Sequence, residues 1–114
     1  AEEALSRSGI RDGICFVYIP HTTAGVTINE NADPDVADDL LLGLEHMIPR
    51  NIPFAHAEGN SEAHLKATLT GSSVCIPIKD FRLALGTWQG IFFCEYDGPR
   101  QRRVFFSFIP LNNG

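Results

Sequence analysis

The stretch that decides the fold runs from residue 73 to residue 109 and reads SVCIPIKDFRLALGTWQGIFFCEYDGPRQRRVFFSFI. It contains four apolar runs, SVCIPI, FRLALGT, GIFFCEY and RVFFSFI, which are separated by KD, WQG and DGPRQ. Short runs of β-branched and aromatic residues between Gly, Pro and Asp are typical of strands joined by turns. The segment therefore predicts several neighbouring strands with antiparallel connections.

Two further strands and a long helix are predicted upstream. ICFVYI, which Pro20 closes, is typical of a buried strand, and GVTINE alternates apolar and polar residues as a strand with one polar face does. From residue 34 the apolar period becomes helical, with Asp33 as the cap, Pro34 in the first turn and Pro49 as the stop. His46 falls near the end of this helix, where a cationic ring interacts favourably with the helix dipole.

A second, shorter helix is predicted from Asn60 or Ser61 to Gly71, with Leu65 and Leu69 on one face. The opening AEEALSRSGIRDG is polar and irregular and predicts no element. Strands, two helices and then several strands favour an α+β fold with a mostly antiparallel sheet or sandwich. A chain of 114 residues is expected to form one domain over residues 1–114.

Charge and composition exclude several classes of function. A net charge of −5 argues against general binding to nucleic acid or to a membrane surface, since both select for excess Lys and Arg. The one basic cluster, Arg100, Arg102 and Arg103, is interpreted as a solvated turn that could hold one small anion.

The three cysteines indicate a reducing cellular compartment. Cys15, Cys75 and Cys94 form no C-x-x-C pair and lie in apolar stretches, which favours buried free thiols in a reducing environment. No apolar segment reaches the length that spans a bilayer. We therefore expect a cytoplasmic protein.

Three of the four histidines are placed where they can converge. His56 and His64 are eight positions apart, and with His64 on the short helix both rings can turn toward the N-terminal end of that helix. His21 arrives from the end of a strand. Three neutral imidazoles can bind a divalent metal such as zinc, with Glu58 as a fourth ligand or as a base. The spacing alone is not specific, because loop histidines are often only solvated and no H-E-x-x-H pair is present.

The sequence GTWQG, residues 86–90, places the single tryptophan in a turn between two glycines. Trp88 could stack on a flat ring while Gln89 supplies a donor and an acceptor. The alternative, that Trp88 covers the end of the core, is favoured by the residues alone.

Three ordered motifs carry a resemblance to a known family. HTTAGVTINENADPDV, HAEGNSEAHLKATLTG and LALGTWQGIFFCEYDGPRQRRV are similar to the YjbQ family, often described as secondary thiamine-phosphate synthases. The match covers Gly13 to Ile109. Family members begin further upstream with another strand, so we expect this chain to lack an N-terminal strand.

The resemblance implies an α+β fold with a β-sandwich, assembled as a homotrimer. It implies that His21, His56 and His64 bind a divalent metal, with zinc as the expected ion. For the remaining matched positions the resemblance implies two roles. The residues expected to act in catalysis are Glu58, Thr22 and Gln89. The residues expected to bind the substrate are Asn60, Trp88 and Arg103.

The activity implied by the resemblance joins a pyrimidine methyl diphosphate to a thiazole phosphate and releases pyrophosphate. The substrate is thus a small phosphorylated molecule, and magnesium could accompany its diphosphate. No dedicated magnesium cluster is evident, because Asp35, Asp38 and Asp39 are explained by the helix dipole. Two alternatives stay open: a metal-dependent hydrolase with Glu58 as the base, and a non-enzymatic trimer whose histidines bind a metal or an anion.

Overall fold

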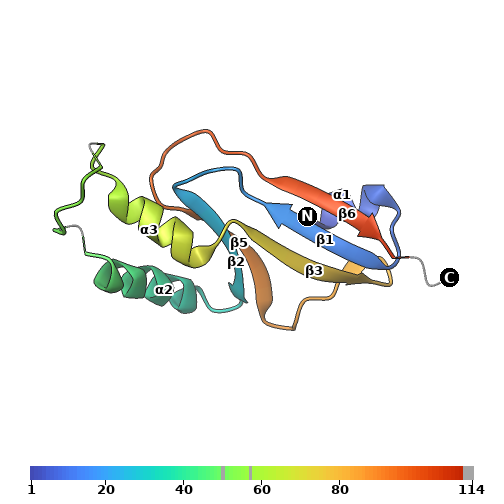
Figure 1. Cartoon of the computed structure of the whole chain (residues 1–114). Helices are drawn as coiled ribbons and strands as arrows, with labels where there is room; N and C mark the ends of the chain where they lie inside the picture. Colours follow the sequence, from blue (N-terminus) through green and yellow to red (C-terminus); the bar gives the residue numbers. More distant parts are fainter. Residues whose placement is uncertain (50, 57, 112–114) are drawn as a thin grey trace.

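Two antiparallel sheets form the centre of the molecule (Figure 1). The computed structural model describes residues 1–49, 51–56 and 58–111. The larger sheet has the order β4-β3-β1-β6, and the smaller one pairs β2 with β5. The strands are β1 (Gly13–Tyr18), β2 (Ala24–Glu30), β3 (Ser73–Lys79), β4 (Arg82–Leu83), β5 (Gln89–Glu95) and β6 (Phe105–Pro110). The predicted α+β class with antiparallel pairing is confirmed.

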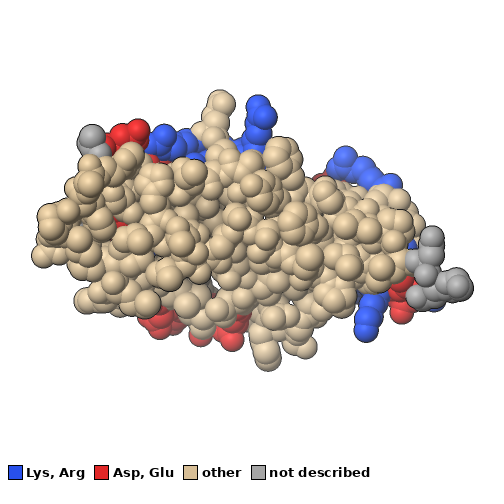
Figure 2. Space-filling model, viewed as in Figure 1, with Lys and Arg blue, Asp and Glu red and all other residues tan. Residues whose placement is uncertain are grey.

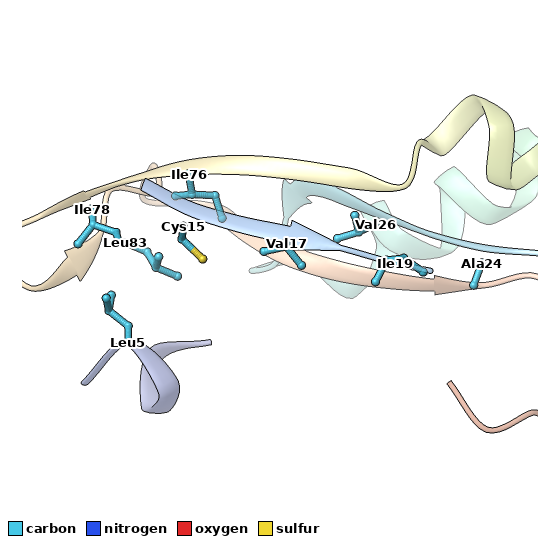
Figure 3. Close-up of a cluster of buried hydrophobic side chains, with 9 residues drawn as sticks. All are labelled: Leu5, Cys15, Val17, Ile19, Ala24, Val26, Ile76, Ile78 and Leu83. Atoms are coloured by element: carbon cyan, nitrogen blue, oxygen red, sulfur yellow. The ribbon is translucent and has the colours of Figure 1, made fainter. Parts of the chain in front are cut away.

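The core lies on one face of the larger sheet. Alternate residues of β1 point into it, and Cys15 and Val17 are fully buried. Apolar side chains from several elements surround them (Figure 3). One of these is Leu5, from a helix, α1 (Glu2–Ser8), which lies over the sheet. The expectation that residues 1–13 are irregular is therefore wrong, because burial of a single leucine stabilises a short helix that its polar sequence does not predict.

The long helix is confirmed as α2 (Pro34–Met47). The Asp33 side chain accepts a hydrogen bond from the Asp35 amide at 2.9 Å, which satisfies one unpaired N–H of the first turn. However, none of its residues is buried, and Leu41 is 56% exposed. The helix is amphipathic, yet its apolar face does not cover the core of this chain.

The short helix is confirmed as α3 (Ser61–Thr70), followed by Gly71. It approaches β2 closely through Ala63 and Ala67, which are buried. A Cβ atom added to Gly25 of β2 would lie 2.6 Å from the carbonyl oxygen of Gly71, so only glycine fits at this contact. Leu65 and Leu69, on the helix's other side, are exposed, so the described residues do not bury the face that these two leucines form.

Two other predictions need correction. The FRLALGT run contributes only the two-residue strand β4. Cys15 is buried as predicted and Cys94 is half-buried, but Cys75 is exposed because it lies on the outer face of β3. All three are free thiols. Among the described residues, no helix is long and apolar enough to cross a membrane.

The elements are spread along one long axis, with principal extents of 55 × 29 × 24 Å. Helices α2 and α3 lie together at one end of the molecule, and α1 lies at the other (Figure 1). The loop between β1 and β2 and the loop between β5 and β6 run next to each other near α3, where Tyr96 donates its amide hydrogen to the Thr23 carbonyl. These two loops and the start of α3 build the site described below.

Candidate functional site

The end of β1 positions the first histidine. Ile19 is buried, and its amide donates to the Ser72 carbonyl at 2.8 Å, which holds the strand end beside the residues that follow α3. The chain then turns through Pro20 to His21, and Thr23 is buried at the start of β2. His21 therefore leaves a rigid strand end rather than a long loop.

An open pocket of about 420 Å³ lies between this turn, the start of α3 and the β5–β6 loop. Its lining residues come from all three segments and are mostly polar: Pro20, His21, Thr22, Thr23, His56, Glu58, Asn60, His64, Arg100 and Arg102. The sequence prediction that the three histidines converge on one region is consistent with this pocket, and Thr22, Glu58 and Asn60 line it as well.

The histidines are near each other, but they are not arranged as a finished metal site. The rings of His56 and His64 meet edge to face, with centroids 5.2 Å apart. Within the described part of the chain, no group of three or more His, Cys, Asp or Glu side chains is arranged to hold a metal ion. The metal assignment to His21, His56 and His64 therefore stays a prediction.

Asn60 is the most informative polar residue of the pocket. Its Nδ2 donates to Asp97 Oδ2 at 2.8 Å, which fixes the orientation of the amide. Its Oδ1 is buried and has no hydrogen-bond partner among the described residues. A buried acceptor without a donor costs about 1–3 kcal/mol, so a cation or a donor group in the pocket would relieve a real penalty.

Two arginines tie the β5–β6 loop to this pocket. Arg102, whose side chain is 11% exposed, donates to both carboxylate oxygens of Glu95 and to Thr23 Oγ1. Arg100 donates to the carbonyl and to the carboxylate of Asp97. The interpretation of this cluster as a solvated turn is therefore wrong for Arg102, because its guanidinium clamps the loop to the start of β2.

The same contacts shift the acidities of the carboxyl groups. The hydrogen bond from Arg102 lowers the pKa of Glu95 to about 2. The Asn60 amide first, and then the Arg100 guanidinium, lower the pKa of Asp97. Both carboxylates therefore stay ionised at neutral pH and neutralise the arginine charge beside the pocket.

His21 has a partner of its own in this loop. The backbone amide of Arg103 donates to His21 Nε2 at 2.8 Å, which joins residues 82 positions apart. The Arg103 residue is exposed, as are Thr22 and Glu58 at the pocket. This backbone contact could not be read from the sequence, which pointed only to the side chain of Arg103.

Trp88 and Gln89 do not belong to the pocket within one chain. Gln89 starts β5 and pairs with Glu30, whereas the pocket adjoins the other end of the ribbon, where Glu95 pairs with Ala24. Six residues of strand separate these ends by about 20 Å. Trp88 is 63% exposed, so the interpretation that it covers the end of the core is wrong, and Gln89 accepts from the Gly86 amide.

A second concave region is apolar. A groove of about 390 Å³ runs between α2 and β5, and its walls include Leu40, Leu41, Leu44, Phe92 and Phe93. At its inner end, Thr70 and Tyr96 share a hydrogen bond between their hydroxyls, and burial raises the pKa of Tyr96. Among its described lining residues this groove has no imidazole, and its one carboxylate, that of Glu95, is bound by Arg102, so the histidine pocket is the better candidate.

Sequence reasoning missed the residues that support the pocket. Glu95 and Asp97 were not singled out, although they accept hydrogen bonds from the two arginines and from the Asn60 amide. Thr23 was considered only as a residue that could orient the His21 ring or hold an anion, whereas its hydroxyl accepts from Arg102. The sequence carried only a weak signal for these contacts. In EYDGPRQRR the acidic residues directly precede basic ones, which predicts ion pairs within this segment. This pattern does not predict that an arginine of the segment also contacts a loop more than 70 residues earlier in the chain.

The fold and the pocket together describe a small α+β protein with a histidine-lined polar site. Comparison with known proteins makes this specific: the family described as "UPF0047 protein YjbQ-like" matches residues 1–110. The chain belongs to this family.

Relatives support the assignment in sequence and in structure. A UPF0047 protein of Methanocaldococcus jannaschii is 57% identical over 106 residues, which cover 93% of this chain and 77% of that protein. YugU of Bacillus subtilis is 47% identical, with 95% and 83% covered. A crystal structure of an uncharacterized YjbQ/UPF0047 protein from Clostridium acetobutylicum has a TM-score of 0.92 and 55% identity, with 95% and 84% covered.

The Arg102–Glu95 clamp makes a prediction about stability and pH. The pKa of Glu95 in the folded protein, about 2, lies below its ordinary value of 4.5. The pair therefore stabilises the fold fully above pH 4.5, and this contribution is lost as the pH falls from 4.5 toward 2. In Glu95→Gln the free energy of unfolding at pH 7 should be lower by about 1–2 kcal/mol, since the clamp is partly buried and charge-assisted.

The measurement is urea unfolding of the variant and of the parent between pH 2 and pH 7. Glu3→Gln is the matched control, because Glu3 pairs with Arg7 on the open surface, with exposed fractions of 85% and 74%. Its effect should stay below about 0.5 kcal/mol. Equal losses in the two variants would show that Glu95 does not clamp the loop.

Proposed function

We propose that the histidine pocket holds one divalent metal ion, with zinc as the first candidate, and acts on a small phosphorylated molecule. The observation that carries this proposal is the buried Asn60 Oδ1, which has no hydrogen-bond partner in the described part of the chain and lies in a pocket that three imidazoles also line. Imidazole nitrogens and carboxylate oxygens are common zinc ligands, and a cation would also satisfy an amide oxygen. The donor set of the pocket thus fits such an ion.

Each residue of the pocket has a role in this proposal. His21, His56 and His64 hold the ion, which when bound supplies positive charge for a phosphoryl oxygen. Glu58, exposed at the pocket, accepts a proton or serves as a fourth ligand. The Thr22 hydroxyl and the Asn60 amide orient the substrate.

The first reaction to test is the one that the family resemblance implies. A thiazole nitrogen attacks the methylene carbon of a pyrimidine methyl diphosphate, and the carbon–oxygen bond breaks as pyrophosphate leaves with the electron pair. Cations must neutralise the leaving group, which favours Arg103 and a magnesium ion carried by the diphosphate. Trp88 and Gln89 would have to come from a neighbouring copy, because in the same chain they lie at the far end of the β2–β5 ribbon.

A metal-dependent hydrolase is the second candidate, and two observations favour it. Arg100 and Arg102 are already paired with Asp97 and Glu95, which leaves less positive charge for a diphosphate. The described lining residues of the pocket of one chain also include no Phe, Tyr or Trp ring on which a pyrimidine could stack. Hydrolysis of a small phosphate or carbonyl compound needs only the ion, a water molecule and Glu58 as the base.

Metal content tests the site directly. Purified wild-type protein should contain close to one equivalent of metal per chain by elemental mass spectrometry, and a His21, His56 and His64 triple alanine variant should contain none. His64→Ala alone should also lose the metal and stay folded. His46→Ala is the matched control, since His46 lies in the last turn of α2 outside the pocket. Metal retained by the triple variant would refute the ligand assignment.

Product analysis separates the two reactions. Zinc-loaded protein with magnesium, the pyrimidine methyl diphosphate and the thiazole phosphate should yield equal amounts of thiamine phosphate and pyrophosphate by mass spectrometry. Glu58→Gln should lower the rate by about 10²–10⁴-fold if Glu58 transfers a proton, whereas Glu62→Gln, on α3, should not. Hydrolysis without a joined product would favour the hydrolase, and no turnover of any small phosphate would favour a non-enzymatic module.

We further propose that the protein is a homotrimer, as the resemblance implies, and that it is cytoplasmic, which its free thiols support. The radius of gyration is 16.4 Å, against about 13 Å for a compact chain of this length. The view in Figure 2 has a broad surface without charged side chains, and the charged ones lie along its edges. The leucines of α2 remain exposed in the single chain, which favours burial by other copies.

The groove beside α2 provides a test of this assembly. Leu41→Glu places a charge in the apolar groove and should convert the trimer to monomers, because burial of an unpaired carboxylate is unfavourable. Leu111→Glu is the control, since Leu111 is a similarly exposed leucine outside the groove. Sedimentation equilibrium measures the mass of each variant. A Leu41→Glu protein that remains trimeric would exclude this surface as the interface.

A further inference from the structure

The hydrogen bond from the Arg103 amide to His21 Nε2 constrains the chemistry of that imidazole. Nε2 is the acceptor, so it carries no proton, and in a neutral ring the proton then lies on Nδ1. The 2.8 Å contact uses the in-plane lone pair of Nε2. His21 therefore has no unprotonated nitrogen left over for another partner.

Binding of a metal by either nitrogen conflicts with this contact. A metal on Nε2 needs the same lone pair that the amide occupies. A metal on Nδ1 displaces the Nδ1 proton, and a neutral ring then carries its proton on Nε2, where it would face the Arg103 N–H as donor against donor. Coordination by His21 thus requires the Arg103 amide to move away.

The surrounding contacts confine that movement to a short segment. Arg102 is held by Glu95 and by Thr23 Oγ1, so the chain before Arg103 is anchored. The strand β6, paired with β1, begins at Phe105. Only residues 103 and 104 lie between these two anchors, and both are exposed. The hydrogen bond can therefore open without loss of the clamp or of the sheet.

We propose that the Arg103 backbone amide is an internal competitor that lowers the affinity of His21 for metal and is released when the metal binds. This inference rests on the proposed metal site and concerns its regulation. Among the described residues, the Arg103 side chain has no ion pair, unlike Arg100 and Arg102. Release of its amide would leave this guanidinium free to turn toward the phosphate of a substrate, so that metal binding and anion binding become coupled.

A pair of substitutions at one position tests the competition. Both substitutions remove the arginine side chain. Arg103→Pro also removes the backbone amide hydrogen, whereas Arg103→Ala keeps that hydrogen. Zinc affinity, measured by competition with a chromophoric chelator, should be about threefold to tenfold higher in the proline variant than in the alanine variant, the range expected for loss of one amide hydrogen bond. Equal affinities, or weaker binding by the proline variant, would overturn the inference.

A second measurement needs no substitution, in case the proline variant folds poorly. Amide hydrogen exchange of wild-type protein should become faster at Arg103 when zinc is added, although ligands usually slow exchange. The Tyr96 amide, which donates to the Thr23 carbonyl in the same loop, is the internal control and should not become faster. Unchanged or slower exchange at Arg103 in the zinc-bound protein would also overturn the inference.

The outcomes separate this inference from the proposed function. If wild type, Arg103→Ala and Arg103→Pro all fail to bind zinc, both the proposed metal site and the proposed competition are refuted. If all three bind zinc with equal affinity, the metal site stands and only the competition is refuted.

Discussion

The structure depends on the burial of β1 between two strands. Its alternate side chains, Cys15 and Val17, are inaccessible to solvent, and both of its edges are paired with antiparallel neighbours. A strand constrained on both edges and on one face has a fixed end, and Pro20 and His21 follow that end directly. The pocket can thus be open and polar while one of its walls remains rigid, since backbone pairing supplies the rigidity.

Charge pairing positions the other wall. The loop between β5 and β6 has no regular structure over residues 96–104, yet Arg102 and Arg100 tie it to the start of β2 and, through Asp97 and Asn60, to the start of α3. These pairs neutralise most of the positive charge near the pocket. Among the described residues, the polar groups of the pocket that still lack a hydrogen-bond partner are Asn60 Oδ1 and the imidazoles of His56 and His64, which is why a cation is a better fit to this site than an anion alone.

More of the apolar side chains lie on the surface of this chain than in a domain that buries its own apolar faces. The core of the single chain is small, whereas leucines of α2, Phe93 of β5, and Phe105, Phe106 and Ile109 of β6 stay exposed. Helical periodicity reports that a face is apolar but does not say which surface covers it. For that reason the sequence could predict α2 and its cap correctly and still leave its packing partner undetermined.

The sequence by itself determined five of the strands and the two longer helices, because turn residues, caps and hydrophobic period act over a few neighbouring residues, whereas the FRLALGT run formed only the two-residue strand β4. It also identified the histidines and motifs that mark the family. Only the tertiary structure decided that α1 forms around Leu5, that Trp88 lies far from the pocket, and that Arg103 contacts His21 through its backbone. These features depend on pairings between residues distant in the chain, and any residue can supply a backbone amide, so local sequence carries no signal for them.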